Sequence, residues 1–287
     1  MNLNNIFGEI EKVDADVYDR LNTRRKALKD FASASGKVAL AAVPFALGSL
    51  FQKAYAGTKS TKDTVVDILN YALTLEYLEA AFYNMALASQ GLIPAGAATG
   101  AIQTIAKHEN AHVAFLKSAI MGAGGTPMAS PMFDFSAGAG TGTGPFKDVF
   151  SNFELFLNVA QTFEDTGVRA YKGRAAEIVQ GGAYLTAALQ IHSVEARHAA
   201  HIRSMRKAYG SGVGNVKPWI TGNMSGINSP LVQPSYDGED NTKQGMPAIE
   251  IVNINGFPIS FNAATEAFDE PLTKDQVIAI VTPFFKK

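Results

Sequence analysis

The sequence predicts an all-α protein: a four-helix bundle with one long crossover, followed by an irregular C-terminal extension. Three observations support this prediction: a motif that occurs twice, apolar residues at helical spacing in four segments, and a long connection between the second and third segments. We expect an export signal, the bundle and the extension, in that order, at residues 1–56, 57–210 and 211–287.

Residues 1–56 resemble a twin-arginine export signal. Arg24 and Arg25 precede an apolar run at residues 38–51, and this run is shorter than the roughly 20 residues of a membrane-spanning helix. Ala54 and Ala56 would form a small-x-small cleavage site before Gly57. We therefore expect export, to the periplasm or otherwise, with no stable transmembrane anchor after cleavage. The alternative is an amphipathic helix that contains a chance pair of arginines.

The pattern of apolar residues predicts four helices, at about residues 61–89, 98–121, 147–180 and 183–209. Ser60 or Thr61 is the expected N-cap of the first helix, and Pro94 prevents that helix from continuing. Runs of glycine end the second and third helices, and Gly210 ends the fourth.

The connection between the second and third helices, at about residues 122–145, is rich in Gly, Ser and Pro. Most connections inside a helical bundle are much shorter. A single long crossover allows the third helix to run parallel to the second.

The extension at residues 211–287 is expected to contain a hairpin and a short helix. The hairpin would pair residues 249–254 with residues 257–261 around the Asn255-Gly256 turn. The short helix would begin after Thr273, which forms a capping box with Gln276. We expect this segment to wrap the bundle or to mediate association between chains. The second alternative would give a homo-oligomer.

The doubled motif reads E-x6-Y and then E-x-x-H, and it occupies residues 76–112 and 164–198. Such an internal repeat indicates two equivalent halves of one fold. Positions i, i+3 and i+7 lie on one side of a helix. The pairs that share a helix face are therefore Glu76 and Tyr83, Glu109 and His112, Glu164 and Tyr171, and Glu195 and His198.

The same faces carry apolar residues, so the motif residues are expected inside the bundle. An unpaired charge in such a core costs several kcal/mol or more. Four carboxylates and two imidazoles would be satisfied there by two divalent metal ions. The expected metal ligands are Glu76, Glu109, His112, Glu164, Glu195 and His198.

Composition excludes several kinds of site. The chain contains no cysteine, which excludes disulfides, iron–sulfur clusters and thiolate metal sites. A formal net charge of −1 gives no support for nucleic-acid binding. All five histidines lie on the second and fourth expected helices: His108, His112, His192, His198 and His201.

The doubled motif resembles that of the ferritin-like di-metal carboxylate bundles, in which two helices give one Glu each and two give E-x-x-H. The resemblance covers about residues 61–210. The segments LTLEYLEAAFY at 73–83 and AFDEPL at 267–272 are similar to the exported bacterial branch related to desiccation-related proteins. Ferritin-like bundles also contain one long crossover.

The resemblance implies roles for the expected ligands and a function for the protein. The Glu of each E-x-x-H motif would bridge two metal ions, the other two Glu would be terminal, and each His would bind one ion. Carboxylates with imidazole suit iron or manganese. The implied function is redox chemistry with dioxygen or peroxide in oxidative-stress protection, as a ferroxidase, a peroxidase or a manganese-catalase-like enzyme.

Alternatives remain open for the ligands and for the function. Glu79 lies one helical turn after Glu76 and is a rival for its ligand position. The protein would otherwise be a non-enzymatic stress or desiccation protein with a structural or empty metal site. Residues 108–112 also read H-E-x-x-H, the motif in which zinc peptidases bind their metal through both histidines.

Tyr83 and Tyr171 are the candidate catalytic residues. Each hydroxyl would hydrogen-bond a ligand carboxylate or carry an electron, and the alternative is two core tyrosines with satisfied hydroxyls. Ligands are usually held by outer hydrogen bonds, for which the candidates are Asp165, His192, Arg197 and His201.

Overall fold

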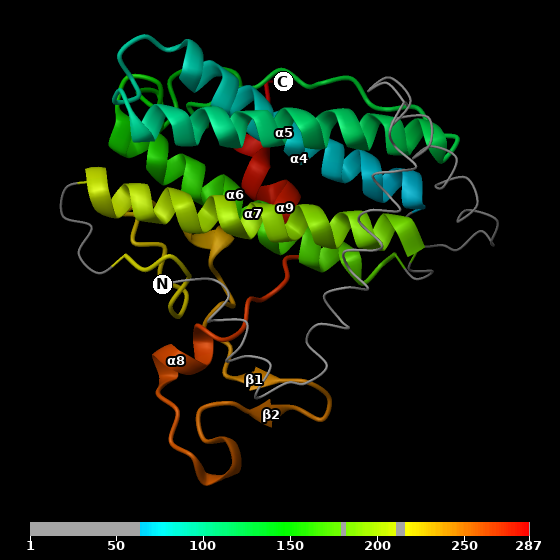
Figure 1. Cartoon of the computed structure of the whole chain (residues 1–287), viewed down its shortest axis with the longest axis vertical. Coiled ribbons are helices and arrows are strands. Elements are labelled where there is room, and N and C mark those ends of the chain that lie inside the picture. Colours follow the sequence, from blue (N-terminus) through cyan, green and yellow to red (C-terminus); the bar gives the residue numbers. More distant parts are fainter. Residues whose placement is uncertain (1–63, 179–181, 211–215, 287) are drawn as a thin grey trace, which may run out of the picture. The chain divides into compact units, whose positions relative to one another are not determined.

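The computed structural model describes residues 64–178, 182–210 and 216–286, all within the unit Leu47–Lys287. Four long helices dominate this part of the chain and lie side by side (Figure 1). They are α4 (Val65–Ala88), α5 (Ala97–Gly122), α6 (Phe153–Ala175) and α7 (Gly182–Tyr209). The most extensive packing is between α4 and α5 and between α6 and α7, and α4 also packs on α6. The predicted all-α bundle is confirmed.

Helices α4 and α6 begin where short polar side chains cap them. Thr64 is the N-cap of α4 and forms a capping box with Asp67. The expected cap at Ser60 or Thr61 is therefore wrong, and both residues lie outside the described residues. The third helix starts later than expected, because the side chain of Asn152 caps α6 by accepting from the backbone N–H of Leu155 at 3.0 Å.

The long crossover between α5 and α6 is folded around Asp134. Its buried carboxylate accepts hydrogen bonds from the Ser136 hydroxyl at 2.6 Å and from the backbone N–H groups of Gly140 and Gly142 at 2.8 and 3.0 Å. The crossover returns along the bundle, so α6 runs parallel to α5 (Figure 1). This connection brings the two halves of the doubled motif together.

The hairpin of the extension forms earlier in the chain than expected. Strand β1 (Lys243–Gln244) pairs antiparallel with β2 (Ile249–Glu250). The expected turn at Asn255-Gly256 falls in a 3-10 turn, η2 (Ile254–Gly256), and the expected second strand leads into helix α8 (Phe261–Thr265), capped by Ser260. The expected second strand has no core face to cover, since Phe257 is 72% exposed and Phe261 is 48% exposed.

The end of the extension packs on the bundle. Helix α9 (Lys274–Val281) has the expected capping box of Thr273 and Gln276, and it contacts α6. It is followed by the 3-10 turn η3 (Thr282–Phe284), and another such turn, η1 (Gln233–Ser235), precedes β1. Leu272 donates its N–H to the carbonyl of Arg169 in α6 at 3.1 Å. In the described residues, no helix has the length and apolar character needed to cross a membrane.

Candidate metal centre

The six expected ligands lie in the core of the bundle, on four different helices. Their four carboxylates are fully buried, the His198 side chain is buried, and the His112 side chain is 12% exposed. Helix α4 contributes Glu76, α5 contributes Glu109 and His112, α6 contributes Glu164, and α7 contributes Glu195 and His198. The spacing of the doubled motif thus brings all six residues to one place.

Three carboxylate oxygens surround the Nδ1 atom of His112. This atom lies 3.1 Å from Glu76 Oε2, 3.1 Å from Glu109 Oε2 and 3.2 Å from Glu195 Oε1. A single ring nitrogen donates at most one hydrogen. One imidazole therefore cannot satisfy three oxygens, whereas a cation between the four atoms would.

A second group of the same composition surrounds the Nδ1 atom of His198. This atom lies 2.8 Å from Glu109 Oε1, 3.3 Å from Glu164 Oε2 and 3.7 Å from Glu195 Oε2. Within each group, the candidate ligand atoms all lie within 4.8 Å of one another. Glu109 and Glu195 belong to both groups and turn one oxygen toward each histidine.

Several polar atoms of the cluster are buried without a hydrogen-bond partner in the described part of the chain. The described residues provide no hydrogen-bond partner for several buried atoms, namely Glu109 Oε1, Glu164 Oε2, both Glu195 carboxylate oxygens and His198 Nδ1. Each such group costs about 1–3 kcal/mol or more when it stays unpaired. Two divalent cations fit this donor set of three carboxylates and one imidazole each.

Burial and close packing shift the pKa values of the cluster's carboxylates and imidazoles. Burial and the neighbouring carboxylates raise the pKa of Glu76 well above its ordinary value. Burial also raises the pKa of Glu164, although His198 opposes this shift. Burial alone would lower the pKa of His112, but the three carboxylates around its ring nitrogen raise it to about 12. A bound metal ion would have to displace such protons.

Glu76 belongs only to the His112 group and Glu164 only to the His198 group, and a tyrosine hydroxyl holds each of these two carboxylates. The Tyr171 hydroxyl donates to Glu76 Oε1 at 2.5 Å, and the Tyr83 hydroxyl donates to Glu164 Oε1. Burial raises the pKa of both tyrosines, as does the carboxylate beside each, so both remain donors. Each bond leaves the Oε2 atom of its carboxylate directed to a histidine. The hydrogen-bonding role expected for the tyrosines is thus present in the structure.

The structure separates Glu76 from its rival Glu79. Both side chains are buried, but only Glu76 belongs to a group of candidate ligands. Glu79 Oε1 instead lies against Gly167 of α6, where an added Cβ would be 3.0 Å from it. The geometry therefore favours Glu76 as the ligand and places Glu79 beside the site.

His108 supports the site from outside. Its Nδ1 atom lies 3.0 Å from His198 Nε2, and the two rings stack with centroids 5.2 Å apart. Burial lowers the pKa of His108, so its neutral ring can accept a hydrogen bond from His198 and orient it. A zinc-peptidase site would require His108 and His112 to bind the same metal ion. Here His108 faces His198 instead, and it belongs to neither group of candidate ligands. Only the clustering of the histidines hinted at this role in the sequence.

The four residues expected to support the ligands have other partners. Asp165 forms a buried ion pair with Arg203, at 2.6 and 2.5 Å, and accepts from the Tyr236 hydroxyl at 2.6 Å. His192 Nδ1 faces the carbonyl of Val168 at 2.9 Å, Arg197 donates to the carbonyl of Ser193, and His201 is exposed. Asp165 therefore joins the bundle to the extension instead of orienting a ligand.

Comparison with known proteins agrees with this geometry. A family model described as a ferritin-like domain matches residues 64–208, which is half of the 287-residue chain. The match begins at the N-cap of α4 and ends one residue before the end of α7. No curated protein and no solved structure matches the chain.

Proposed function

We propose that this chain, which belongs to the ferritin-like family, binds two divalent ions of iron or manganese and reacts with dioxygen or peroxide. One observation carries the proposal: Glu109 and Glu195 each turn one oxygen toward His112 and the other toward His198. Two carboxylates placed in this way are suited to bridge two metal ions. Glu76 and Glu164 would then be terminal ligands.

The residues of the chain would position and insulate the metal ions. Tyr171 and Tyr83 hold the terminal carboxylates, and His108 orients His198. The buried position of the carboxylates excludes water, which strengthens electrostatic interactions in the site. The metal ions, when bound, would supply electrons to the oxidant. This function would serve in oxidative-stress protection, and the twin-arginine motif at Arg24 and Arg25 supports an exported protein.

Elemental mass spectrometry of the purified protein tests the metal site. We expect about two iron or manganese ions per chain, and loss of both in the Glu109→Gln/Glu195→Gln variant. This variant keeps the size of both side chains but removes the two bridging charges. Glu250→Gln is a matched control, because Glu250 is exposed on β2. A protein without stoichiometric metal would contradict the proposal.

The reaction of the metal-loaded protein with an oxidant tests the second half of the proposal. Stopped-flow absorbance would follow the oxidation of the bound metal by dioxygen and, separately, by hydrogen peroxide. Reaction with either oxidant, absent from Glu109→Gln/Glu195→Gln, supports a redox enzyme. Two bound ions that react with neither oxidant would instead indicate a non-enzymatic protein in which the metal braces the core.

A further inference from the structure

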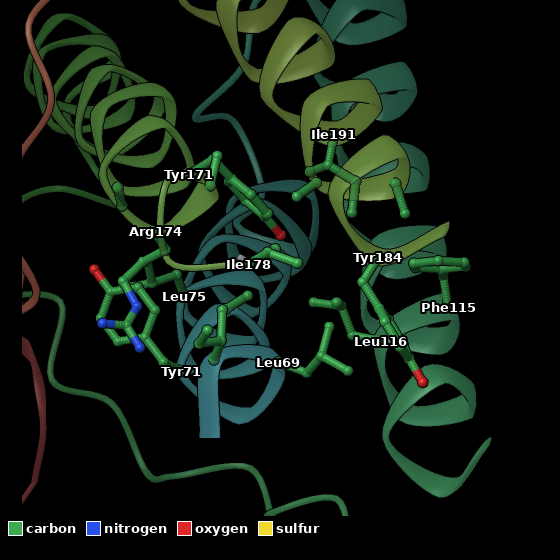
Figure 2. A pocket seen from close by; sticks show the side chains of 16 residues that line it. Leu69, Tyr71, Leu75, Phe115, Leu116, Tyr171, Arg174, Ile178, Tyr184 and Ile191 are labelled. Carbon is green, nitrogen blue, oxygen red and sulfur yellow. The ribbon is translucent and has the colours of Figure 1, made fainter. Parts of the chain in front are cut away.

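An apolar cavity lies inside the bundle next to the candidate metal centre (Figure 2). Ala72, Leu116 and Ile191 line it, and each is four residues from a candidate ligand on its own helix. Four residues of helix span about 6 Å along the axis. The cavity is therefore the next layer of the core beyond the site. Tyr171 forms the boundary, since its ring lines the cavity and its hydroxyl donates to Glu76.

The cavity is small, and carbon atoms form most of its wall. Its volume is about 30 Å³, and a volume of roughly 10–15 Å³ is needed to hold one water molecule. The guanidinium group of Arg174 is turned to one side, where it stacks on the ring of Tyr71 at 5.3 Å (Figure 2). Larger apolar cavities, of roughly 150 Å³, stay dry and take up small apolar guests such as benzene or xenon. The space is therefore suited to one small apolar molecule.

The opposite end of the site is closely packed. Beside Tyr83, the ring of Phe82 stacks on Phe156 with centroids 4.9 Å apart and meets Phe163 edge-on at 5.0 Å. Tyr83 itself contacts the edge of Phe156. The two halves of the doubled motif thus differ in what lies beyond their tyrosines. Aromatic rings fill the core beside Tyr83, whereas the core beside Tyr171 contains the cavity.

We propose that this cavity holds one molecule of dioxygen and delivers it to the site past Tyr171. The inference rests on the proposed function and narrows its oxidant to one. Dioxygen has no hydrogen bonds to lose on entering an apolar space. Hydrogen peroxide would lose those it makes with water, which is costly where nothing replaces them. In the reaction, two iron(II) ions would each give up one electron, and dioxygen would take up two electrons and two protons to form hydrogen peroxide.

Xenon tests the cavity without any metal or activity. Crystals of the full-length, metal-free protein would be pressurised with xenon, and its density located. We expect one xenon atom between Leu75, Leu116 and Ile191. No xenon at this position would overturn the proposal. Xenon binding that Ala188→Phe does not abolish would overturn it too, because Ala188 lines the same cavity.

Filling the cavity should separate the two oxidants. In iron(II)-loaded protein, Ala188→Phe should slow oxidation by dioxygen by about tenfold, which corresponds to about 1.4 kcal/mol in activation free energy. Oxidation by hydrogen peroxide should keep its rate. Leu189→Phe is the matched control, because Leu189 is the next residue of α7 and is 48% exposed. Equal slowing with both oxidants, or no slowing with dioxygen, would overturn the proposal.

A smaller substitution guards against misfolding. Ala188→Leu adds less volume, so its effect on the dioxygen reaction should lie between those of the wild type and Ala188→Phe. It decides the question if Ala188→Phe fails to fold, which circular dichroism would show. A wild-type protein that reacts with neither oxidant would refute the proposed redox function. Xenon in the cavity would then show that the apolar site exists independently of that function.

Discussion

Tyr83 and Tyr171 act across the bundle and not along their own helices. Each lies seven residues after a candidate ligand, yet each donates its hydroxyl to the ligand of the other half. The exchange requires α4 and α6 to run antiparallel, so that the Tyr of one helix meets the Glu of the other. Spacing alone identified these residues, but only packing decided which carboxylate each one holds.

Removing one of these hydroxyls should weaken metal binding. Tyr171→Phe leaves Glu76 Oε1 without its donor, and loss of a hydrogen bond that orients a ligand typically lowers metal affinity by about 10–100-fold. Metal titrations in competition with a chromophoric chelator would measure the change. Tyr77→Phe is the control, because Tyr77 lies next to Glu76 on α4 and its hydroxyl donates to the Met128 carbonyl at 3.3 Å. Equal affinities for Tyr171→Phe and the wild type would show that the hydroxyl does not orient Glu76.

At the scale of the elements, α6 contacts both the candidate site and the extension. It carries Glu164 on the side of the site, and on another side it supports the extension. Arg169 donates to the carbonyls of Ser235 at 2.6 Å and Glu270 at 2.8 Å, and it also pairs with the carboxylate of Glu239 at 2.8 Å. Close contact with α6 therefore holds a segment that lies far away in the sequence.

A glycine allows part of this contact. A Cβ at Gly173 would lie 2.0 Å from the carbonyl oxygen of Leu272, so Gly173→Ala must displace backbone. We expect a loss of about 1–3 kcal/mol in the free energy of unfolding, as for other overpacked sites. Gly100→Ala is the control, because a Cβ at the exposed Gly100 of α5 meets nothing within 4 Å. It should raise stability by about 0.5–1 kcal/mol.

Urea denaturation followed by circular dichroism would measure both changes. If Gly173→Ala were as stable as the wild type, the contact between α6 and the extension would not contribute to stability.

At the scale of the whole molecule, the proposed metal binding would be linked to the protons that the bundle holds. The folded pKa values of Glu76, Glu164 and His112 all lie above their ordinary values of 4.5 for Glu and 6.5 for His. The metal-free folded protein therefore binds these protons more tightly than the unfolded chain does. Its stability from these groups is greatest at low pH and is lost as pH rises through the raised pKa values.

Metal binding should consequently release protons and strengthen as pH rises. Affinity should increase by about tenfold per pH unit for each proton displaced. Isothermal titration calorimetry of manganese(II) binding, in buffers that differ in ionisation enthalpy, would count these protons. The Glu109→Gln/Glu195→Gln variant, tested in parallel, should show neither binding nor release. Manganese binding that is independent of pH between 6 and 8 would mean that the cluster is already deprotonated without metal.

The extension shows where prediction from sequence was weaker. The helix capped by Thr273 was found because a capping box is a local signal. The hairpin was misplaced because Phe257 and Phe261 of the expected second strand are exposed, and Ser260 starts a helix within that strand. Strand pairing depends on distant neighbours more than helix formation does.

The sequence by itself determined the four helices and the six residues that meet between them, because helical periodicity places residues at fixed spacings on one face. Only the tertiary structure decided three further features: the position of Glu79 against Gly167, His108 beside His198, and the cavity beyond Tyr171. Each of them depends on side chains from several helices. The space between helices follows from how those side chains pack, and no single segment of the chain contains that information.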